Sequence, residues 1–530
     1  MSEGAHLLNS EQIILKVMNM KKKLAVLLMT FLFGATNMFA QTAIDSLINA
    51  KVSPLADMVE QTVQYPIYMQ FFGMEEAVAF PIVLLILIFG GLGFSLYFLF
   101  PNIRWFGTAV SVVRGKYDDV NEEKEGLPPV EGEVSAFQAL STALSATVGL
   151  GNIAGIAIAI SVGGPGATFW MIVAGFLGMA SKFTECTLGV RFREIDKNGK
   201  VYGGPLYYLR KGLREKGFAK LGLGFAWVYA WIMIFASLTA GSMFQINQAT
   251  EQVVPIISNL MGIQSNSIGF FFGLTIAIIV AVVIIGGIKR IGKVAETVVP
   301  LMVGIYVVAG LFILIANYDQ LVPAFQTIAQ EAFSPTAVQG GILGIMVVGF
   351  TRAAFSNEAG LGSAAFAHSA VRTRYAASEG MVALLEPFID TIVVCTMTAL
   401  VIIVTGTECQ AGSGIQCTSD AFESVLPNFS LILGVAALLF AFSTMLAWSY
   451  YGLQAWKYLF GRQLLTENIY KMLFCIFIVL GAASSLGAVR RLADSMMLAL
   501  VIPNMLGLVF LAPLVKEEVQ KYLKAIRQES

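Results

Sequence analysis

The sequence predicts an all-α polytopic membrane protein, built as a five-plus-five inverted repeat of helices with one extra N-terminal transmembrane helix. Of its 530 residues 57% are hydrophobic and only 13% are charged, and the mean hydropathy is +0.74. Soluble domains carry about 25% charged residues, so this composition indicates a chain that lies mostly in a bilayer. Eleven apolar stretches have roughly the 20 residues that a membrane-spanning helix needs. Two of them, five helices apart, are interrupted by glycine and polar residues, which predicts the repeat.

The expected segments follow from the positions of these stretches. An extra helix and cytoplasmic linker (77–134) precede a first repeat at 135–320 and a second at 336–515, and a cytoplasmic tail covers 516–530. The eleven expected spans have the approximate limits 77–100, 135–160, 167–190, 222–246, 267–288, 294–316, 336–356, 378–404, 430–456, 467–486 and 490–514.

The basic residues between the spans follow the positive-inside rule, by which cytoplasmic loops are enriched in Lys and Arg. The expected outside loops 247–266, 317–335 and 405–429 contain neither residue, whereas the expected inside loops and the tail contain many. Arg490 and Arg491 are an exception in a turn too short to reverse the orientation. The pattern predicts a bacterial cytoplasmic (inner) membrane protein with the mature N-terminus outside and the C-terminus cytoplasmic. The basic residues form no continuous face, so no nucleic-acid partner is expected.

The N-terminus resembles a signal peptide, expected at residues 1–40. Three lysines (21–23) precede an apolar run (24–39) and a small residue, Ala40. A first membrane helix is the alternative, but the run is short and a polar, periplasmic segment (41–76) follows it. We therefore favour a cleaved signal.

The first interrupted span contains the sequence ATVGLGNIAG at residues 146–155. Glycine in a helix interior costs about 1 kcal/mol relative to alanine, and backbone groups freed in lipid cost several kcal/mol more unless protein or water receives them. A broken membrane helix therefore predicts a site, here for a small ion and its co-substrate. Half-helix N-termini suit a carboxylate, and freed carbonyl groups suit a cation such as Na⁺.

The second interrupted span contains GFTRAAFSNEAGLG at residues 349–362. Because it is the fifth span after the first interrupted one, the two broken helices are expected to run in opposite directions. Glycine kinks used only for packing would explain one broken helix. They explain two at equivalent positions of a repeat poorly, so the pair favours a shared central site.

Ionisable residues at membrane depth are candidates for function. Arg352, Glu358 and Asp390 are such intramembrane charges. Arg352 lies six residues before Glu358, so a structural ion pair between them is as reasonable as a role in transport. Lys182 and Glu185 lie three apart on one helix face and are expected to form a structural pair.

Five motifs follow one another along the chain: TVGLGNIAG at 147–155, GGPGATFW at 163–170, GMASKFTE at 178–185, FSNEAGLGS at 355–363 and FSTMLAWSYYG at 442–452. In this order they resemble the alanine or glycine:cation symporter family (the sodium:alanine symporters). The resemblance spans roughly residues 77–515 and implies the leucine-transporter (LeuT) fold, with two inverted repeats. It implies alternating-access import of alanine or glycine with a coupling ion, Na⁺ before H⁺, and no cofactor. The alternative is another carrier of this fold, with proton coupling or a different small substrate.

In the first break, the resemblance implies a substrate site. The backbone N–H groups of Gly149, Leu150 and Gly151 would bind the substrate carboxylate, and Asn152 would place its amide near the ion or the substrate. An asparagine that only satisfies freed backbone groups is the alternative. Gln245 resembles the substrate-facing glutamine of the family.

In the second break, the resemblance implies the opposite wall of the same site. Phe355, Ser356 and Gly360 would form it, with backbone carbonyls toward the substrate ammonium and the Phe355 ring against a small side chain. Trp448 would line the pocket or a gate, although tryptophan is also common as an interfacial anchor.

The same resemblance implies a sodium site between two helices. Ser145 and Val148 would offer carbonyl oxygens, and Ser443 and Thr444 would offer hydroxyl oxygens. Such hard oxygen ligands suit an alkali cation. Serine and threonine in membrane helices also often bond only to their own backbone, which is the alternative for these hydroxyls.

Other classes of protein are poorly supported. A membrane enzyme needs a nucleophile with its base or a set of metal ligands, but there is no HExxH or GxSxG motif and His368 stands apart. A channel needs repeated polar rings, which the scattered polar residues do not provide. Cys409 and Cys417 share a loop and would form a disulfide if it faces the periplasm; two free thiols are the alternative.

Overall fold

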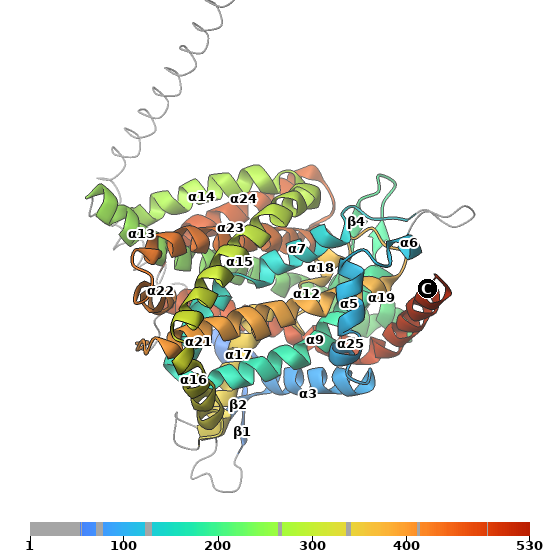
Figure 1. The fold of residues 1–530 in the computed structure, drawn as a ribbon. Helices are drawn as coiled ribbons and strands as arrows, with labels where there is room; N and C mark the ends of the chain where they lie inside the picture. The colour runs from blue at the N-terminus through green and yellow to red at the C-terminus, as the bar shows by residue number, and fades with distance from the viewer. Residues whose placement is uncertain are drawn as a thin grey trace, which may run out of the picture.

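The computed structural model describes residue 54 and residues 56–69, 78–121, 130–262, 268–334, 341–410, 414–484 and 486–529. The expected signal peptide and most of the segment that follows it lie outside these residues. Within them the chain is almost entirely helical, and most of the long helices run side by side (Figure 1). Two small antiparallel ribbons accompany the helices: β1 (Pro66–Met69) with β2 (Val78–Pro81), and β3 (Glu194–Ile195) with β4 (Val201–Tyr202).

The helices fall into an N-terminal group and two longer series. The N-terminal group is α3 (Ile82–Tyr97), α4 (Pro101–Arg104), α5 (Phe106–Val113) and α6 (Asp118–Asn121). The first series is α7 (Ala136–Thr147), η1 (Leu150–Asn152), α8 (Ala154–Gly163), α9 (Ala167–Arg191), α10 (Pro205–Tyr207), η2 (Tyr208–Gly212), α11 (Leu213–Glu215), α12 (Ala219–Leu238), η3 (Thr239–Phe244), α13 (Gln245–Met261), α14 (Ile268–Ile284), α15 (Gly287–Ala316) and α16 (Tyr318–Glu331). The second is α17 (Gly341–Asn357), α18 (Ala365–His368), α19 (Ala376–Ala383), α20 (Leu385–Pro387), η4 (Phe388–Cys395), α21 (Thr396–Val404), α22 (Ile415–Glu423), α23 (Phe429–Phe460), α24 (Leu464–Ala482) and α25 (Leu486–Glu529).

Length and composition identify membrane-spanning candidates among the described helices. Seven are long and apolar enough to cross a bilayer, or eight if the bent pair formed by α7 and residues 150–163 counts as one span. Three shorter apolar helices, α3, α14 and α17, complete the set. Every one of the eleven expected stretches contains one of these helices, and that each crosses the bilayer stays a prediction.

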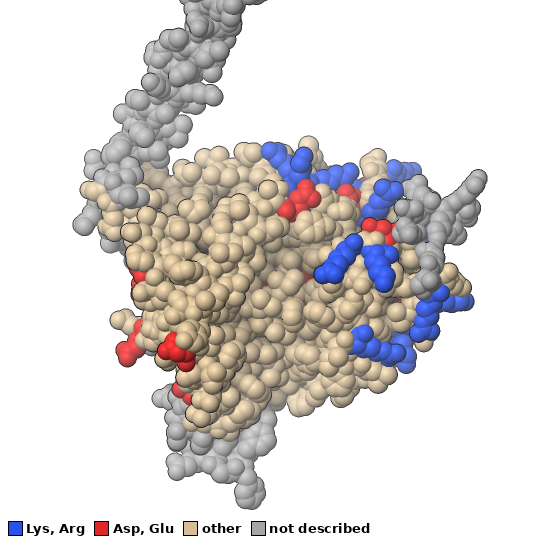
Figure 2. Space-filling model, viewed as in Figure 1, with Lys and Arg blue, Asp and Glu red and all other residues tan. Residues whose placement is uncertain are grey.

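Charged and uncharged residues occupy separate zones of the visible surface, as expected for a membrane protein. Lys and Arg gather at the end where α5, α6 and β4 lie, and Asp and Glu are seen at the opposite end near α16 and α22 (Figures 1 and 2). Between the two ends the visible surface is largely uncharged. Large apolar side chains are exposed on the long helices, among them Ile278 of α14, Val308 and Ile315 of α15 and Val435 of α23. An exposed apolar belt on this scale fits contact with lipid.

A half-buried arginine ties the segment before α7 to the loop after α18. The guanidinium of Arg193 donates hydrogen bonds to the carbonyl oxygens of Glu131, Ser369, Val371 and Thr373, at 2.8, 3.0, 2.5 and 3.1 Å. A parallel bridge between residues 134 and 371 joins the same two segments. These contacts fix the start of the first broken helix against the end of the second.

An ion-pair cluster lies beside this connection on the polar face. The carboxylate of Glu194 contacts Arg210, Lys211 and Arg462 at 2.9, 3.2 and 3.0 Å. Partial burial raises the pKa of Glu194, but its contacts with Lys211 and Arg462 outweigh burial and leave the pKa below its usual value.

A lowered pKa in the folded state means that Glu194 contributes stability at neutral pH and loses that contribution as the pH falls through its folded pKa. Glu194→Gln should therefore lower the melting temperature at pH 7, and the difference from the wild type should disappear below about pH 4. Thermal unfolding of both proteins across that pH range measures it. Asp319→Asn, at an exposed residue in α16, is the control and should follow the wild type. A difference in melting temperature that persisted at low pH would contradict the stabilising role of the ionised Glu194.

Candidate functional site

The first break lies between α7 and α8, which are bent by 52°. The α-helix ends at Thr147, Gly149 is extended, and a single turn, η1, follows. Polar side chains receive the freed N–H groups: Asn152 Oδ1 accepts from Gly149 N at 2.8 Å, and Gln245 Oε1 accepts from Leu150 N at 3.4 Å. A Cβ at Gly149 would lie 2.5 Å from Thr444 Oγ1, so a side chain at this position does not fit.

The second break lies between α17 and α18. The helix ends at Asn357, and the backbone then takes positive φ at Glu358 (+56°), Gly360 (+86°) and Gly362 (+83°). Positive φ is uncommon outside glycine, so the conformation of Glu358 has to be held by its contacts. Its carboxylate accepts hydrogen bonds from Trp448 Nε1, at 2.9 Å, and from Ser363 Oγ.

A cavity of about 230 Å³ lies between the two breaks. Its lining combines both breaks with η3, α13, α23 and α25: Ala146, Thr147, Gly149, Gly151, Ala240, Gln245, Phe355, Glu358, Trp448 and Met497.

The structure brings most of the expected substrate residues to this cavity. Gly149, Gly151, Gln245, Phe355 and Trp448 line it directly. The Leu150 N–H bonds to Gln245, and the Asn152 side chain bonds to Gly149. Both therefore lie directly behind residues that line the cavity.

Two expected substrate residues lie elsewhere. Gly360 packs against Leu87 and Met505, and its carbonyl accepts from Asn504 at 2.9 Å. Ser356 is turned behind the wall, where its hydroxyl donates to Asp390 Oδ2 at 2.8 Å. Neither belongs to the cavity lining.

The four expected sodium-site residues lie together where α7 meets α23. Ser145 Oγ donates to the carbonyl of Ser443 at 2.5 Å, and Thr444 Oγ1 donates to the carbonyl of Ser145 at 2.9 Å. Val148, at the end of α7, is fully buried. The Thr444 hydroxyl therefore bonds to the opposite helix, against the alternative that it bonds only to its own backbone. The Ser443 hydroxyl follows that alternative in part, because it donates to Phe440 O of its own helix at 3.0 Å and to Met302 Sδ of α15 at 3.4 Å.

Asp390 joins the two breaks. Its carboxylate accepts from Asn152 Nδ2 of the first break at 2.6 Å and from Ser356 Oγ of the second at 2.8 Å, and Thr391 Oγ1 adds a third bond at 2.8 Å. Asn357 donates to Thr391 at 2.9 Å. The side chain is fully buried in η4. The sequence singled out Asp390 as an ionisable residue, but not as this connection.

Arg352 does not pair with Glu358. Its guanidinium forms an ion pair with Asp494 of α25, and its charged group lies 5.5 Å from the centre of the Phe355 ring. Both partners are nearly buried. The expected pairing fails because Arg352 precedes the break, whereas Glu358 follows the helix end and turns toward Trp448.

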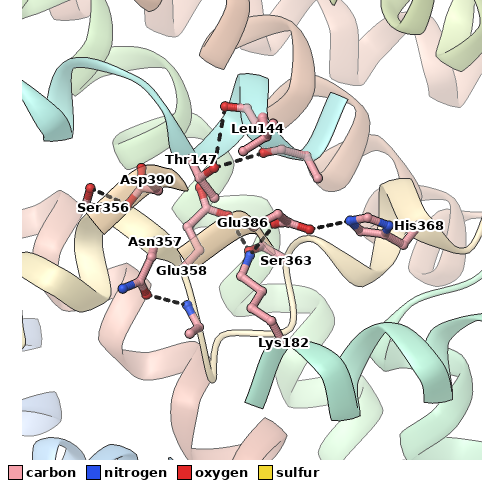
Figure 3. A network of polar contacts seen from close by, with 12 residues as sticks. Leu144, Thr147, Lys182, Ser356, Asn357, Glu358, Ser363, His368, Glu386 and Asp390 are labelled. Atoms are coloured by element: carbon pink, nitrogen blue, oxygen red, sulfur yellow. Dashed lines mark hydrogen bonds and ion pairs between the residues drawn. The ribbon is translucent and has the colours of Figure 1, made fainter. Parts of the chain in front are cut away.

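The pairing expected for Lys182 is also wrong. Lys182 Nζ lies 3.1 Å from Glu386 Oε2, whereas Glu185 accepts a hydrogen bond from Asn504 at 2.8 Å. Figure 3 shows Lys182, Ser363, Glu358 and Glu386 converging beside the second break.

His368 stands apart in the sequence but not in the structure. Nδ1 lies 2.6 Å from Glu379 Oε1, and Nε2 contacts Glu386 Oε1. An ionised carboxylate can only accept a hydrogen bond, so contact of both ring nitrogens with carboxylates requires one proton more than a neutral imidazole carries. Lys182 and this proton contribute two positive charges, and Glu379 and Glu386 contribute two negative ones, so the net charge of the four buried residues is zero. The Cys186 thiol lies near His368 and Glu386, but Lys182 would repel a metal ion at the shared carboxylate.

Cys409 and Cys417 are joined in a disulfide, with Cα atoms 5.4 Å apart. The bridge connects the segment after α21 to α22. Thr418, next to it in α22, donates to the carbonyl of Ile153 at 3.0 Å. The bridged segment therefore covers the far end of the first break.

The lining is completed by Ala146, Thr147, Ala240, Glu358 and Met497, of which only Glu358 was a candidate from the sequence. Ala146 and Thr147 lie in the glycine motif and could have been included. Ala240 and Met497 are apolar residues in apolar spans, so no local signal separates them from lipid-facing positions.

Known proteins resemble the chain over most of its length. The model of the sodium:alanine symporter family matches residues 67–530. The sodium/alanine symporter AgcS of Methanococcus maripaludis is 39% identical over 85% of this chain and 96% of its own. The amino-acid carrier protein AlsT of Bacillus subtilis is 32% identical over 84% of this chain and 90% of its own. The probable sodium/glutamine symporter GlnT of the same organism is 32% identical over 82% and 87%.

A solved structure supports the fold. The structure of MhsT in complex with L-phenylalanine matches with a TM-score of 0.51 at 16% identity, covering 74% of this chain and 99% of the other. MhsT has the LeuT fold, so the expected fold type is confirmed, while the number of spans and the limits of the two repeats stay predictions.

Substitution of Gly149 tests the close packing at the first break. Gly149→Ala should lower the free energy of unfolding by about 1 kcal/mol or more, because the new methyl group has no room beside Thr444. Gly155→Ala is the matched control, since a Cβ there meets nothing within 4 Å in α8 and should add about 0.5 kcal/mol of helix stability. Thermal unfolding of the purified proteins compares them, and equal effects would contradict the tight fit.

Single and double substitutions test the Arg352–Asp494 ion pair. Arg352→Met and Asp494→Leu should each lower stability by about 3 kcal/mol, because each leaves one buried charge without its partner. The double variant should lie closer to the wild type than either single variant. Arg290→Met, at an exposed arginine, is the control and should melt as the wild type does. Strictly additive losses would show that the two residues do not interact.

Proposed function

Because the chain belongs to the sodium:alanine symporter family, and is a multi-pass membrane transporter and not an enzyme, we propose that it imports alanine or glycine together with Na⁺. The observation that carries this proposal is the small cavity closed between two broken helices. AgcS, named as a sodium/alanine symporter, supports both the substrate and the ion. Alternating access would expose the cavity first to the outside and then to the cytoplasm.

The substrate carboxylate binds at the first break. The N–H groups of Gly149, Leu150 and Gly151 lie at the start of η1, where the helix dipole favours an anion. The bond from Leu150 N to Gln245 is long, at 3.4 Å, so a carboxylate replaces it with little loss. Charge recognition by backbone groups requires no cationic side chain in the cavity.

The size of the cavity limits the substrate side chain. Phe355 lines it and packs edge-on against Phe244, with ring centres 4.8 Å apart. The indole of Trp448 is held by its hydrogen bond to Glu358. These two aromatic walls would restrict the substrate side chain, which favours glycine and alanine over larger amino acids.

Na⁺ binds between α7 and α23, at the carbonyl groups of Ser145 and Val148 and the hydroxyl groups of Ser443 and Thr444. In the structure the hydroxyls of Ser145 and Thr444 bond to carbonyl groups of the opposite helix. Of the proposed ligands, the Ser145 carbonyl and the Thr444 hydroxyl are thus already in contact, and an ion bound to both would hold α7 in place. Because α7 leads directly to the substrate N–H groups, ion and substrate raise each other's affinity by the same factor.

Proton coupling is the second candidate, and the His368 cluster favours it. This buried group holds a proton between two carboxylates and lies close to Glu358 in the cavity wall. A different small substrate is the other alternative, in keeping with GlnT, whose name refers to glutamine. For the orientation we propose a mature N-terminus outside and a cytoplasmic C-terminus. For the repeats we propose residues 135–320 and 336–515.

Calorimetry of alanine binding with and without Na⁺ tests the proposed function. Thr444→Ala removes a proposed ion ligand and should raise the Na⁺ concentration needed for alanine binding about 10-fold or more, which corresponds to one lost hydrogen-bond-strength contact to a charge. Asn152→Ala should weaken alanine binding by a similar factor at saturating Na⁺. Thr275→Ala removes a threonine that bonds only to its own helix and is the control. Unchanged binding in both variants would remove this site, and binding that follows pH but not Na⁺ would favour the proton.

A further inference from the structure

Glu358 differs from every other residue that lines the cavity. Of the ten lining residues it is the only one with an ionisable side chain. Its carboxylate is held by two neutral donors, the indole N–H of Trp448 at 2.9 Å and the hydroxyl of Ser363. Trp448 lines the cavity as well, so this end of the carboxylate is at the cavity wall.

No cationic side chain of the described residues forms an ion pair with this carboxylate. Lys182 lies near Glu358, but its ammonium group pairs with Glu386 at 3.1 Å, and Arg352 of the same broken helix pairs with Asp494. Burying a carboxylate without a positive partner is unfavourable by several kcal/mol, because neutral hydrogen bonds replace only part of its hydration. A carboxylate has about four acceptor positions, so two bonds leave room for another donor.

We propose that Glu358 binds the α-ammonium group of the substrate and thereby restricts the site to zwitterionic amino acids. This inference rests on the proposed function and adds to it the residue that recognises the amino group. The N–H groups of the first break bind the carboxylate end, and Glu358 of the second break binds the ammonium end. A carboxylic acid without an amino group would leave Glu358 uncompensated and would bind poorly.

A purely structural role is the competing explanation. Glu358 has positive φ, and its bond to Ser363 spans the unwound turn, so it could serve only to hold that turn. The two roles make different predictions. Loss of a turn anchor weakens all ligands together, whereas loss of an ammonium partner weakens only ligands that carry an ammonium group.

The test compares alanine with propionate, which has the same carbon skeleton and carboxylate but no amino group. Both compete with labelled alanine for the purified full-length protein at saturating Na⁺, and the ratio of their inhibition constants is measured. Glu358→Gln keeps the shape and an acceptor for Trp448 but removes the charge. We expect alanine to bind about 10- to 100-fold more weakly, as for the loss of one hydrogen bond to a charged group, while propionate is unchanged or improved.

Two matched variants control for burial and for the turn. Glu185→Gln neutralises another fully buried glutamate that does not line the cavity. Ser363→Ala removes the bond across the turn and keeps the charge of Glu358. Both should preserve the wild-type ratio of propionate to alanine.

The deciding quantity is the inhibition constant of propionate divided by that of alanine. A fall of this ratio in Glu358→Gln alone supports the proposal. An unchanged ratio in that variant overturns it, as does a change confined to the Na⁺ requirement, which would make Glu358 an ion ligand. If Glu358→Gln gives no folded protein, Glu358→Asp decides: weaker binding of alanine alone supports the proposal, and an equal loss for both ligands overturns it. Failure of the wild type to bind alanine with Na⁺ would instead refute the proposed function.

Discussion

The structure depends on one constraint: in lipid, a backbone N–H or C=O group that leaves its helix has to find a partner inside the protein. Two helices of this chain are broken, and side chains supply partners for their freed groups. At the first break, Gln245 of α13 and Asn152 of the break itself accept from the N–H groups, and at the second Asn504 of α25 donates to the carbonyl of Gly360. Satisfying the breaks therefore brings α13 and α25 to them, and the cavity is the small volume that these contacts leave.

The charges inside the protein follow from the same low polarity. Most of the buried ionisable groups near the breaks have a charged partner. Lys182, Glu386, His368 and Glu379 compensate one another, and Arg352 and Asp494 form a separate pair. Asp390 and Glu185 are instead held by neutral donors, Asp390 by groups from both breaks and Glu185 by Asn504. Among these groups and Glu358, only Glu358 lines the cavity.

The sequence predicted what is encoded locally. Composition and span length predicted a helical membrane protein, and glycine within apolar runs located both breaks, with Gly149, Gly151 and Phe355 at the cavity. Pairings between distant segments were not predictable in this way. Lys182 and Glu386 are 204 residues apart, and helix spacing suggested the nearer Glu185 instead. Gly360 was assigned to the cavity by its place in the motif, but the positive φ values from Glu358 onward turn it toward Leu87 and Met505. The direction of an unwound segment depends on the helices that receive it.

The bonds of Arg193 have a mechanical consequence. One guanidinium, two residues after α9, donates to carbonyl groups of the segment that leads into α7 and of the loop that follows α18, so it ties both segments to the end of α9. Separating these segments would break all four bonds. Where α7 packs against α23, the two bonds between Ser145, Ser443 and Thr444 cross the contact. A change at those oxygens would therefore alter how firmly α7 is held at the first break.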